Sequence, residues 1–225
     1  MPESAPLTIA VLGGTGAEGS GLAVRWARAG HRVVIGSRSS ERAAQVAVQL
    51  SERIAPRRIE GTTNREAAAR AGIVVLSVPY AAQRLTVDDV RAKLAGKILI
   101  DVTVPLVPPR VSRVQLPEGG SAVEAMQKLL GDATRVVSAF QNVSAHHLGD
   151  PARAIECDVL VCGDDRDARE TVVRLANDAG LRGVHAGPLA NSAAAEALTS
   201  VLIAINRHYK VPAAGIRITG VFEPR

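Results

Sequence analysis

Three glycines near the N-terminus, Gly14, Gly16 and Gly19, follow the spacing G-x-G-x-x-G. Residues 7–12 before them form an apolar run rich in β-branched side chains, and residues 17–29 after them have a helical pattern. In this arrangement the first glycine permits a sharp turn, the second lets a pyrophosphate approach the backbone, and the third lets the helix pack on the strand. The free N–H groups at the start of the helix then face the phosphates. The spacing therefore predicts a dinucleotide-binding loop, with a ligand-free glycine turn as the alternative.

The second predicted strand, residues 33–35, leads to the position that distinguishes the two nicotinamide dinucleotides. A carboxylate there binds the ribose 2′-hydroxyl group of NAD, whereas a basic residue accommodates the 2′-phosphate of NADP. This chain carries Ser37 and Arg38 at the strand end, and Arg42 follows about one helical turn later. Because guanidinium groups suit phosphate oxygens, the pattern favours NADP. The alternative is that both arginines are solvated charges at the start of a helix.

The elements that must position these residues alternate between strands and helices. Helical patterns separate apolar runs that predict strands over residues 7–12, 33–35, 59–62, 73–79 and 97–102. The alternation predicts an α/β fold with a doubly wound, Rossmann-type parallel sheet, in an NADP-binding domain of residues 1–150. Because ligands bind beyond the carboxyl ends of such strands, we expect Val78 and Pro79 at the cofactor crevice. A brief helix after the third strand is expected to be capped by Asn64.

The second half of the chain predicts a smaller C-terminal α/β portion, residues 151–225, that packs on the first half. A predicted strand over residues 157–163 is followed by a helix that Asp164 and Asp165 are expected to cap, with a paired-carboxylate active site as the alternative. The last helix, residues 191–210, is strongly apolar. Such a helix is usually buried, so we expect it to cross the sheet or to pack on its twin in a homodimer.

Further polar residues follow the predicted strand over residues 135–138. Gln141 and Asn142 come just past its carboxyl end, where they are placed to hydrogen-bond the amide of a nicotinamide ring. His146 and His147 are adjacent, so on a helix they point in different directions and do not form a chelating pair. We therefore expect no metal site.

Residues 103–120 interrupt the alternation of strands and helices. Four prolines exclude a helix through this segment, and loops of this length are uncommon unless they are functional. Two interpretations stay open. The loop is either a surface excursion or a flap over a second substrate, in which Arg110 or Arg113 meets an anion.

Composition limits the classes of partner. The chain has 225 residues, of which 47% are hydrophobic, and this predicts a globular protein. Its formal charge of +5 favours anionic partners, but only 2% of residues are aromatic, so it lacks platforms for stacking bases. We therefore expect anionic small molecules as partners and no nucleic acid.

No apolar run approaches the ~20 residues that span a bilayer, and no membrane association is expected. Cys157 and Cys162 fall on opposite faces of a strand, which disfavours a disulfide and fits the reducing cytoplasm.

Several longer motifs together resemble one family. They are V-L-G-G-T-G, V-I-G-S-R-S-S-E-R, L-S-V-P, V-S-A-F-Q-N-V-S-A, V-C-G-D-D and A-G-P-L-A-N-S. The glycine motif is shared with many dehydrogenases, whereas the last two blocks are far more specific. Over nearly its whole length the chain resembles the NADPH-dependent reductases of the deazaflavin coenzyme F420.

The resemblance implies where the two cofactors bind. The pyrophosphate loop corresponds to Thr15, Gly16, Ala17 and Glu18, and the 2′-phosphate contacts to Ser37, Arg38 and Arg42. Positions on the nicotinamide side correspond to Val78, Val104 and Ala145. The deazaflavin is expected over the nicotinamide, in a cleft against the C-terminal portion and facing Thr199. Archaeal members carry His at the position of Gln141 and Arg at that of Ala193.

The resemblance also implies a reaction, direct hydride transfer between nicotinamide C4 and deazaflavin C5. The two cofactors carry this chemistry, so no side chain is expected to act as a nucleophile or acid–base catalyst. One alternative is an NADPH-dependent reductase of another acceptor, namely a flavin, a ferric chelate or an imine; the reductase portion of membrane ferric reductases has the same type of domain. A non-catalytic NADP-binding protein is a second alternative, and a nucleic-acid binder is the weakest.

Overall fold

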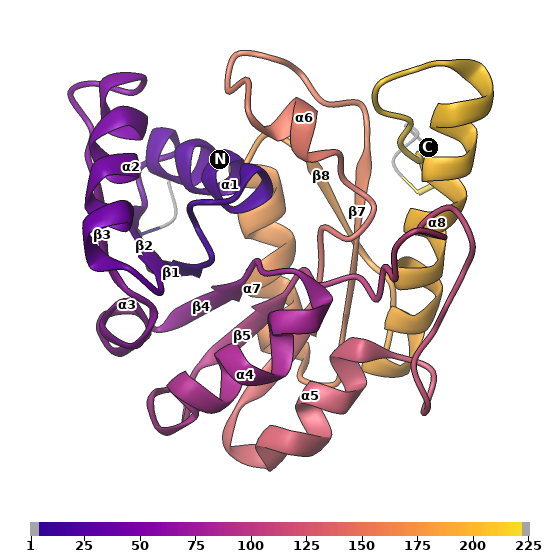
Figure 1. Cartoon of the computed structure of the whole chain (residues 1–225), viewed down its shortest axis with the longest axis horizontal. Helices are drawn as coiled ribbons and strands as arrows, with labels where there is room; N and C mark the ends of the chain where they lie inside the picture. Colours follow the sequence, from indigo (N-terminus) through magenta and orange to yellow (C-terminus); the bar gives the residue numbers. More distant parts are fainter. Residues whose placement is uncertain (1–4, 222–225) are drawn as a thin grey trace.

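The computed structural model describes residues 5–221, which form one eight-stranded sheet flanked by helices (Figure 1). The strands are β1 (Thr8–Leu12), β2 (Arg32–Ser37), β3 (Ile59–Thr63), β4 (Ile73–Leu76), β5 (Ile98–Asp101), β6 (Arg135–Ser138), β7 (Asp158–Gly163) and β8 (Arg182–His185). The longer helices are α1 (Ala17–Arg28), α2 (Ser40–Glu52), α3 (Asn64–Arg70), α4 (Tyr80–Val90), α5 (Ala122–Leu130), α7 (Arg166–Asp178) and α8 (Ser192–Tyr209). Short helical segments are α6 (Ala145–Leu148), η1 (Arg91–Lys93), η2 (Gly131–Ala133) and η3 (Leu189–Asn191).

The strands follow the order β3-β2-β1-β4-β5-β6-β7-β8. All pairings from β3 to β6 are parallel, and the order doubles back between β1 and β4. This arrangement confirms the predicted doubly wound α/β fold, and it places the point of reversal directly beside the glycine loop. One feature was not predicted: β7 runs antiparallel to β6, whereas β8 is parallel to β7.

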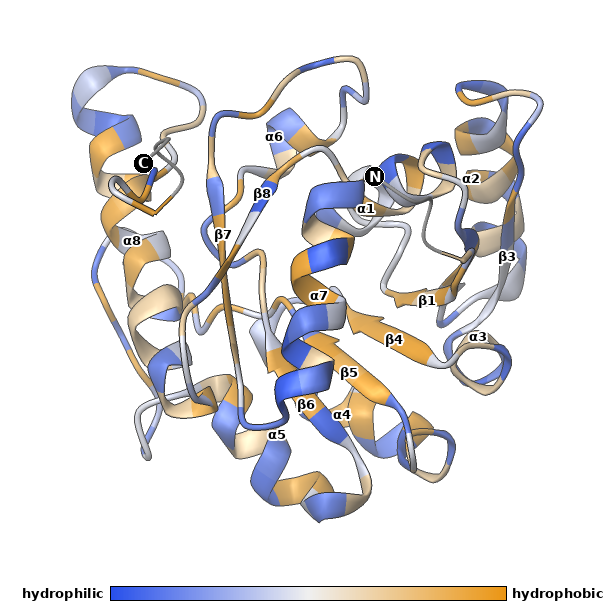
Figure 2. Cartoon of the chain, turned by 180° about the vertical axis from the view of Figure 1, so that it is seen from behind, coloured by the Kyte–Doolittle hydropathy of each residue, from blue (hydrophilic) through white to orange (hydrophobic). Residues whose placement is uncertain are grey.

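Alternate residues of the strands enter two cores, one on each face of the sheet. In β1, Ile9 and Val11 belong to the core covered by α1, α2 and α7, whereas Ala10 and Leu12 belong to the core covered by α3, α4 and α5. All four side chains are completely buried. Figure 2 shows β1, β4 and β5 as hydrophobic strands. Burial on both faces explains why these strands read as continuous apolar runs in the sequence.

Two of the predicted helix caps differ in the structure. Thr63, not Asn64, caps α3, because the Thr63 hydroxyl accepts the N–H of Glu66. Asp165 caps α7 as predicted, but Asp164 accepts the N–H of Leu189 instead and ties the start of α7 to η3. These two carboxylates therefore have separate structural contacts.

The last helix, α8, packs beside β7 and α5 but keeps an apolar face open to solvent. Val201, Ile205 and Tyr209 recur at intervals of four residues and are 44%, 37% and 69% exposed. By length and a mean hydropathy of 1.3, residues 189–209 are the one candidate membrane span in the part of the chain that the structure describes. About a third of that segment, 33%, is buried inside the protein.

Candidate active site

The turn after β1 depends on Gly13, which the predicted spacing did not single out. Its φ is +74°, in the left-handed region, and a Cβ atom there would lie 2.2 Å from the carbonyl oxygen of Ser77. The N–H of Gly13 donates to the carbonyl of Gly36 at 3.1 Å. Gly14 has no positive φ, but its Cβ would lie 2.7 Å from Cβ of Ile35. The sharp turn assigned to Gly14 is therefore made by Gly13, and Gly14 allows close packing on β2.

The other two glycines of the motif lie where the spacing predicts. A Cβ atom on Gly16, the N-cap of α1, would meet only the Gly13 carbonyl oxygen within 4 Å, at 3.4 Å, so the space beside this backbone is open. A Cβ atom on Gly19 would lie 2.9 Å from the Cα atom of Gly14 and 3.2 Å from Oγ of Ser77. Gly16 thus leaves room for a ligand, whereas Gly19 lets α1 rest on the loop and the end of β4.

The first turn of α1 presents N–H groups to this open space. The first hydrogen bond of the helix runs from the N–H of Ser20 to the carbonyl of Gly16, at 2.9 Å. The N–H groups of Ala17 and Glu18 precede it, so they have no intrahelical acceptor. Thr15 is partly exposed beside them. A helix start of this kind attracts anions, and the residues present fit a pyrophosphate.

The end of β2 supplies positive charge on the same side of the loop. Ser37 is its last residue, and the side chains of Arg38 and Arg42 are exposed. Neither guanidinium makes an ion pair or a hydrogen bond within residues 5–221. The hydroxyl of Ser39 accepts the N–H of Arg42 and caps α2, which fixes the backbone under both arginines. Both cations are therefore free to bind a phosphate.

The ends of β4 and β5 form the other side of the site. Val78 lies against the glycine loop, since a Cβ on Gly13 would approach its Cγ1 to 2.7 Å. Pro79 is exposed and caps α4, and Val104 is partly exposed in the loop after β5. Asp101, the last residue of β5, is a completely buried carboxylate that accepts the N–H of Thr103 at 2.9 Å. Sequence reasoning missed Asp101 because it reads as the last residue of a buried strand.

Gln141 and Asn142 are buried, at 3% and 2% exposure. Gln141 Nε2 donates to the carbonyl of Asp101 at 2.8 Å, and Asn142 Nδ2 donates to the carbonyl of Asp158 at 2.6 Å. These bonds hold the segment after β6 against β5 and β7. The two amide oxygens have no hydrogen-bond partner among the described residues, so acceptor groups remain for a ligand or water.

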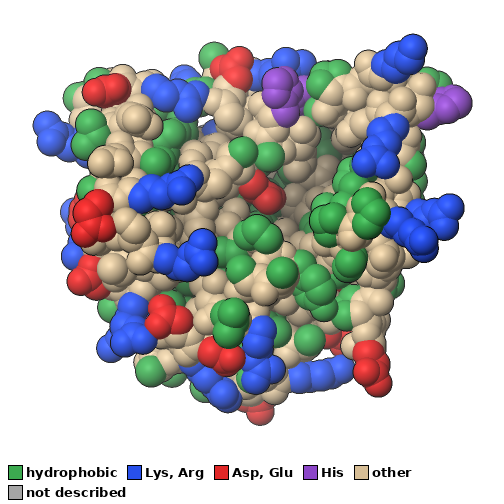
Figure 3. Space-filling view, in the orientation of Figure 1, with side chains coloured by type: hydrophobic (Ala, Val, Ile, Leu, Met, Phe, Trp, Pro, Cys, Tyr) green, Lys and Arg blue, Asp and Glu red, His purple; other side chains and the backbone are tan. Residues whose placement is uncertain are grey.

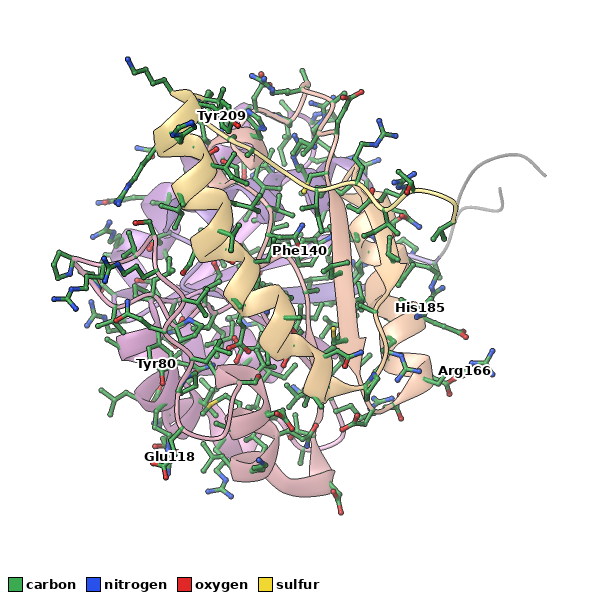
Figure 4. All side chains as sticks on the ribbon, turned by 90° about the vertical axis from the view of Figure 1, so that its right-hand side faces the viewer. Tyr80, Glu118, Phe140, Arg166, His185 and Tyr209 are labelled. Atoms are coloured by element: carbon green, nitrogen blue, oxygen red, sulfur yellow. The ribbon has the colours of Figure 1, made fainter. Side chains whose placement is uncertain are left out.

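The helix α8 reaches this segment through Thr199. Its hydroxyl donates to the carbonyl of Gln141 at 2.8 Å, so the structure brings together two residues that are far apart in the sequence. Figure 4 shows Phe140, the residue before Gln141, in the interior beside α8. Phe140 has a φ of +74° and packs edge-on against Trp26 of α1, with ring centroids 5.8 Å apart. Ala145 begins α6 and is partly exposed.

Arg25 of α1 fixes α6 in place. It is 6% exposed and donates to the carbonyl groups of five residues: His147, Leu148, Asp150, Arg153 and Ala179. Burial lowers the pKa of this guanidinium. The same helix that starts at the glycine loop therefore also orients the segment that carries Ala145.

The remaining candidates lie at the edge of the site. His146 and His147 are on α6 with ring centroids 5.7 Å apart, and the structure shows no cluster of three metal-ligating side chains within its described range. Arg110 and Arg113 are exposed in the loop of residues 102–121. That loop is tied to α8 by a hydrogen bond of 2.9 Å from Arg207 to the hydroxyl of Ser112.

The surface is hollowed where these elements meet. Figure 3 shows the hollow in the middle of the face, between α1 on one side and α8 on the other, with acidic atoms inside it. Basic side chains lie around its margins. The hollow lies over the carboxyl ends of the strands, where open α/β sheets bind their ligands.

Comparison with known proteins agrees with this geometry. The sequence model of the family described as NADP oxidoreductase coenzyme F420-dependent matches residues 8–105. The F420-dependent NADP reductase of Methanothermobacter thermautotrophicus is 43% identical, over 96% of this chain and 97% of the relative. That of Methanocaldococcus jannaschii is 40% identical, over 96% and 99%. A solved structure from Arthrobacter sp. FB24, of a protein assigned as an F420-dependent NADP reductase, is 26% identical with a TM-score of 0.78, covering 95% of this chain and 99% of that one.

The two archaeal proteins align with this chain from one end of the fold to the other, so the likeness includes both the glycine loop and the C-terminal helix. The solved structure shares the whole architecture as well. The chain belongs to the family of F420-dependent NADP reductases.

Proposed function

We propose that this protein transfers a hydride between NADP(H) and the deazaflavin coenzyme F420. The observation that carries the proposal is the open cradle at the start of α1, with two unpaired arginines beside it. Gly16 leaves the backbone accessible, the first N–H groups of α1 are free, and Arg38 and Arg42 have no partner in the described protein. These features fit a dinucleotide with a 2′-phosphate.

The chain's own residues bind and orient. Thr15, Gly16, Ala17 and Glu18 receive the pyrophosphate, and Ser37, Arg38 and Arg42 receive the 2′-phosphate. The nicotinamide half then extends over β4 and β5, beside Val78, Pro79 and Val104. The acceptor ring lies on the opposite wall, toward the residues Gln141, Asn142, Ala145 and Thr199.

The two bound cofactors supply the redox chemistry, a hydride shift between two ring carbons. The protein's contribution is to hold the rings at reacting distance and to exclude water, which is the usual division of work in such enzymes. We assign no residue as a nucleophile. The buried ring of Phe140, held against Trp26, fixes the backbone of Gln141 at the acceptor side.

We further propose the division of labour between the halves of the chain. Residues 1–150 bind NADP, and residues 151–225 complete the deazaflavin cleft. The change of strand direction between β6 and β7, on either side of residue 150, supports this boundary. The two cysteines are free and buried, which supports a place in the reducing cytoplasm.

We also propose a homodimer formed through α8. Val201, Ile205 and Tyr209 make an exposed apolar stripe along one face of the helix, and Figure 4 shows Tyr209 near its outer end. Exposed stripes of this kind mark interaction surfaces. Sedimentation analysis should give a dimer for the native protein and a monomer for Ile205→Glu. A monomeric native protein would contradict the proposal.

The experiment that tests the activity uses the purified protein, NADPH and oxidised F420. The visible absorbance of the deazaflavin should bleach far more efficiently with NADPH than with NADH. Flavin, a ferric chelate and a cyclic imine serve as parallel acceptors. Turnover with one of these and none with F420 would replace the deazaflavin in the proposal, and binding of NADPH without any turnover would indicate a non-catalytic protein.

A further inference from the structure

Glu196 of α8 is a buried carboxylate outside the set of residues that receive the two cofactors. It is 1% exposed, and no lysine or arginine forms an ion pair with it in residues 5–221. Burial of a charged group costs free energy unless polar partners compensate for the lost water. The hydrogen-bond partners of Glu196 therefore indicate what this carboxylate does.

The partners that the structure shows lie at the start of α5, 73 to 75 residues earlier in the chain. Oε1 of Glu196 accepts the Ser121 hydroxyl at 2.6 Å and the N–H of Val123 at 3.2 Å, and Oε2 accepts the N–H of Ala122 at 2.8 Å. Burial raises the pKa of Glu196, but these donors oppose the rise. The N-terminus of a helix also favours a negative charge. Glu196 thus joins α8 to the first turn of α5.

The hydroxyl of Ser121 adds a second contact between the two helices. Ser121 is the N-cap of α5 and accepts the N–H groups of Val123 and Glu124 at 3.1 Å and 3.0 Å. Because its single proton goes to Glu196, the hydroxyl of Ser192, 2.6 Å away, must be the donor in the contact between the two serines. Ser192 and Glu196, one turn apart on α8, therefore both bind the start of α5.

Apolar packing alone does not fix the position of α8. Its buried residues are Ser192, Ala195, Glu196, Ser200 and Leu202, so only two of the five are apolar. Hydrophobic contacts are non-directional, whereas a hydrogen bond sets a distance and an angle. The position of α8 along and about its own axis therefore depends on its polar contacts.

The face of α8 that carries Glu196 also carries Thr199, three residues later. Positions three apart are neighbours on one face of a helix. The Thr199 hydroxyl donates to the carbonyl of Gln141 at 2.8 Å. A shift of α8 at Glu196 would therefore move the hydroxyl that holds the segment after β6.

These contacts are part of a closed ring around the end of β5. Gln141 Nε2 donates to the carbonyl of Asp101, whose carboxylate accepts Nε2 of Gln83 at 2.7 Å. Gln83 Nε2 also donates to the carbonyl of Ala122 at 3.4 Å, and the N–H of Ala122 donates to Glu196. The ring runs from β5 through α4, α5 and α8 and returns through the segment after β6. Buried networks of this kind make the elements that they join rigid.

We propose that Glu196 is a positioning residue for the acceptor and acts through Thr199 and Gln141. By holding α8 against the start of α5, its carboxylate sets where Thr199 meets the segment after β6, and so fixes the wall toward which the acceptor ring lies. The role rests on the proposed function for where the acceptor lies, and not for which acceptor it is. Hydride transfer depends on this placement, because the reacting atoms must be held nearly in contact.

The test measures kcat/KM for F420 and the dissociation constant of NADPH in Glu196→Gln. Glutamine keeps the size of the side chain and one acceptor oxygen, but it presents an NH2 group to a donor at the start of α5, so the contact between the helices shifts. We expect kcat/KM for F420 to fall at least about tenfold, and the dissociation constant of NADPH to change less than about twofold. Unchanged kcat/KM, or equal losses for both cofactors, would overturn the inference.

Gln127→Ala, at the other end of α5, is the matched control. Gln127 donates to the carbonyl groups of Gly131 and Thr134 and accepts the N–H of Val136, so its loss also removes three contacts of this helix. The variant should lower the Tm, as Glu196→Gln does, but leave kcat/KM for F420 as in the native protein. Equal losses of activity in the two variants would show that Glu196 acts only through stability, and would overturn the inference.

A double-mutant cycle with Thr199→Val tests the route from Glu196 to the acceptor. Valine removes the hydroxyl that binds Gln141 at nearly the same side-chain volume. If Glu196 acts through Thr199, adding Glu196→Gln to Thr199→Val should lower kcat/KM by less than about twofold further, because coupled residues are not additive. Losses that multiply in the double variant would overturn the route and with it the inference.

Hydrogen exchange separates this inference from the proposed function, since it needs no turnover. Glu196→Gln should speed up amide exchange over residues 139–143, whereas Gln127→Ala should leave exchange there as in the native protein. If the native protein does not bleach F420 but the variants differ in this way, the positioning role is upheld and the proposed acceptor alone is overturned. Unchanged exchange over residues 139–143 in Glu196→Gln overturns the inference, whether or not F420 bleaches.

Discussion

Replacing Arg38 and Arg42 together with alanine should raise KM for NADPH while leaving kcat nearly unchanged. Both side chains are exposed and unpaired in the described protein, so the fold loses no contact with them. The N-cap of α2 also survives, because Ser39 bonds the backbone N–H at position 42. Any loss therefore reports binding of the 2′-phosphate rather than stability.

The size of the effect follows from the number and exposure of the contacts. A hydrogen bond to a charged group is worth about 1.5 kcal/mol or more, and exposure to solvent reduces it toward 1 kcal/mol. Two such contacts give about 2–3 kcal/mol, which is about 30- to 150-fold in KM. Because the reacting carbon is remote from this phosphate, the loss is one of uniform binding and spares kcat.

Steady-state kinetics with NADPH and NADH distinguish this explanation from a general defect. NADH lacks the 2′-phosphate, so its KM should not change in the double variant. Arg166→Ala, at an exposed position on α7, is the matched control and should leave both KM values as in the native protein. Equal rises of KM for both nucleotides, or a fall in kcat at constant KM, would refute the assignment of these arginines.

Three further predictions concern the scaffold. Gly16→Ala should weaken NADPH binding by about tenfold or more at an unchanged Tm, because the added Cβ meets the ligand and not the protein. Gly19→Ala should lower both the affinity for NADPH and the Tm in thermal shift assays, because its Cβ would lie 2.9 Å from Cα of Gly14. Arg25→Met should lower the free energy of unfolding by roughly 3 kcal/mol in urea titrations, because it leaves a cluster of carbonyl groups without donors. Burial raises the pKa of Asp101 from 3.8 to about 6 on folding, so this carboxyl should cost the native protein about 3 kcal/mol of stability as pH rises through that window, and the pH dependence of Asp101→Asn should lack this contribution.

Each of these predictions has a result that would contradict it. A Gly16→Ala protein that binds NADPH normally would show that no pyrophosphate approaches that backbone. If Arg25→Met unfolded at the same urea concentration as the native chain, the buried carbonyl groups must find other donors. If the native protein and Asp101→Asn changed in stability by the same amount between about pH 4 and about pH 6, Asp101 would not be held protonated by burial.

Local sequence patterns predicted the first half of the fold well because each element there is specified by neighbouring residues. The apolar run of β1, the glycines after it and the helix that follows form one continuous signal, and the structure confirms them. The residues that follow β2, which include no carboxylate before Glu41, were likewise visible in the sequence. Fine detail was less predictable: Gly13 rather than Gly14 takes the positive φ, because the two adjacent glycines are equivalent in a spacing argument.

Features that depend on tertiary neighbours were not predictable. The pairing of Thr199 with Gln141 joins positions 58 residues apart, and the direction of β7 depends on how the chain returns after α6. Asp101 looks like an ordinary strand residue until its complete burial and its hydrogen bonds from Gln83 and Thr103 are known. The side chains of Gln141 and Asn142 were expected to hydrogen-bond the amide of a nicotinamide ring, and only the structure shows that their nitrogens donate to the backbone.

The unbroken ladder of strands from β3 to β8 has a consequence for how substrates are exchanged. Backbone hydrogen bonds join the two halves of the sheet in the described residues, so we expect the halves to move as one body rather than to swing apart. We expect the two cofactors to enter and leave through movement of the segment of residues 102–121 and its attachment to α8. Exchange of cofactors at this edge of the site, rather than closure of two lobes, is then the step that such a movement would control.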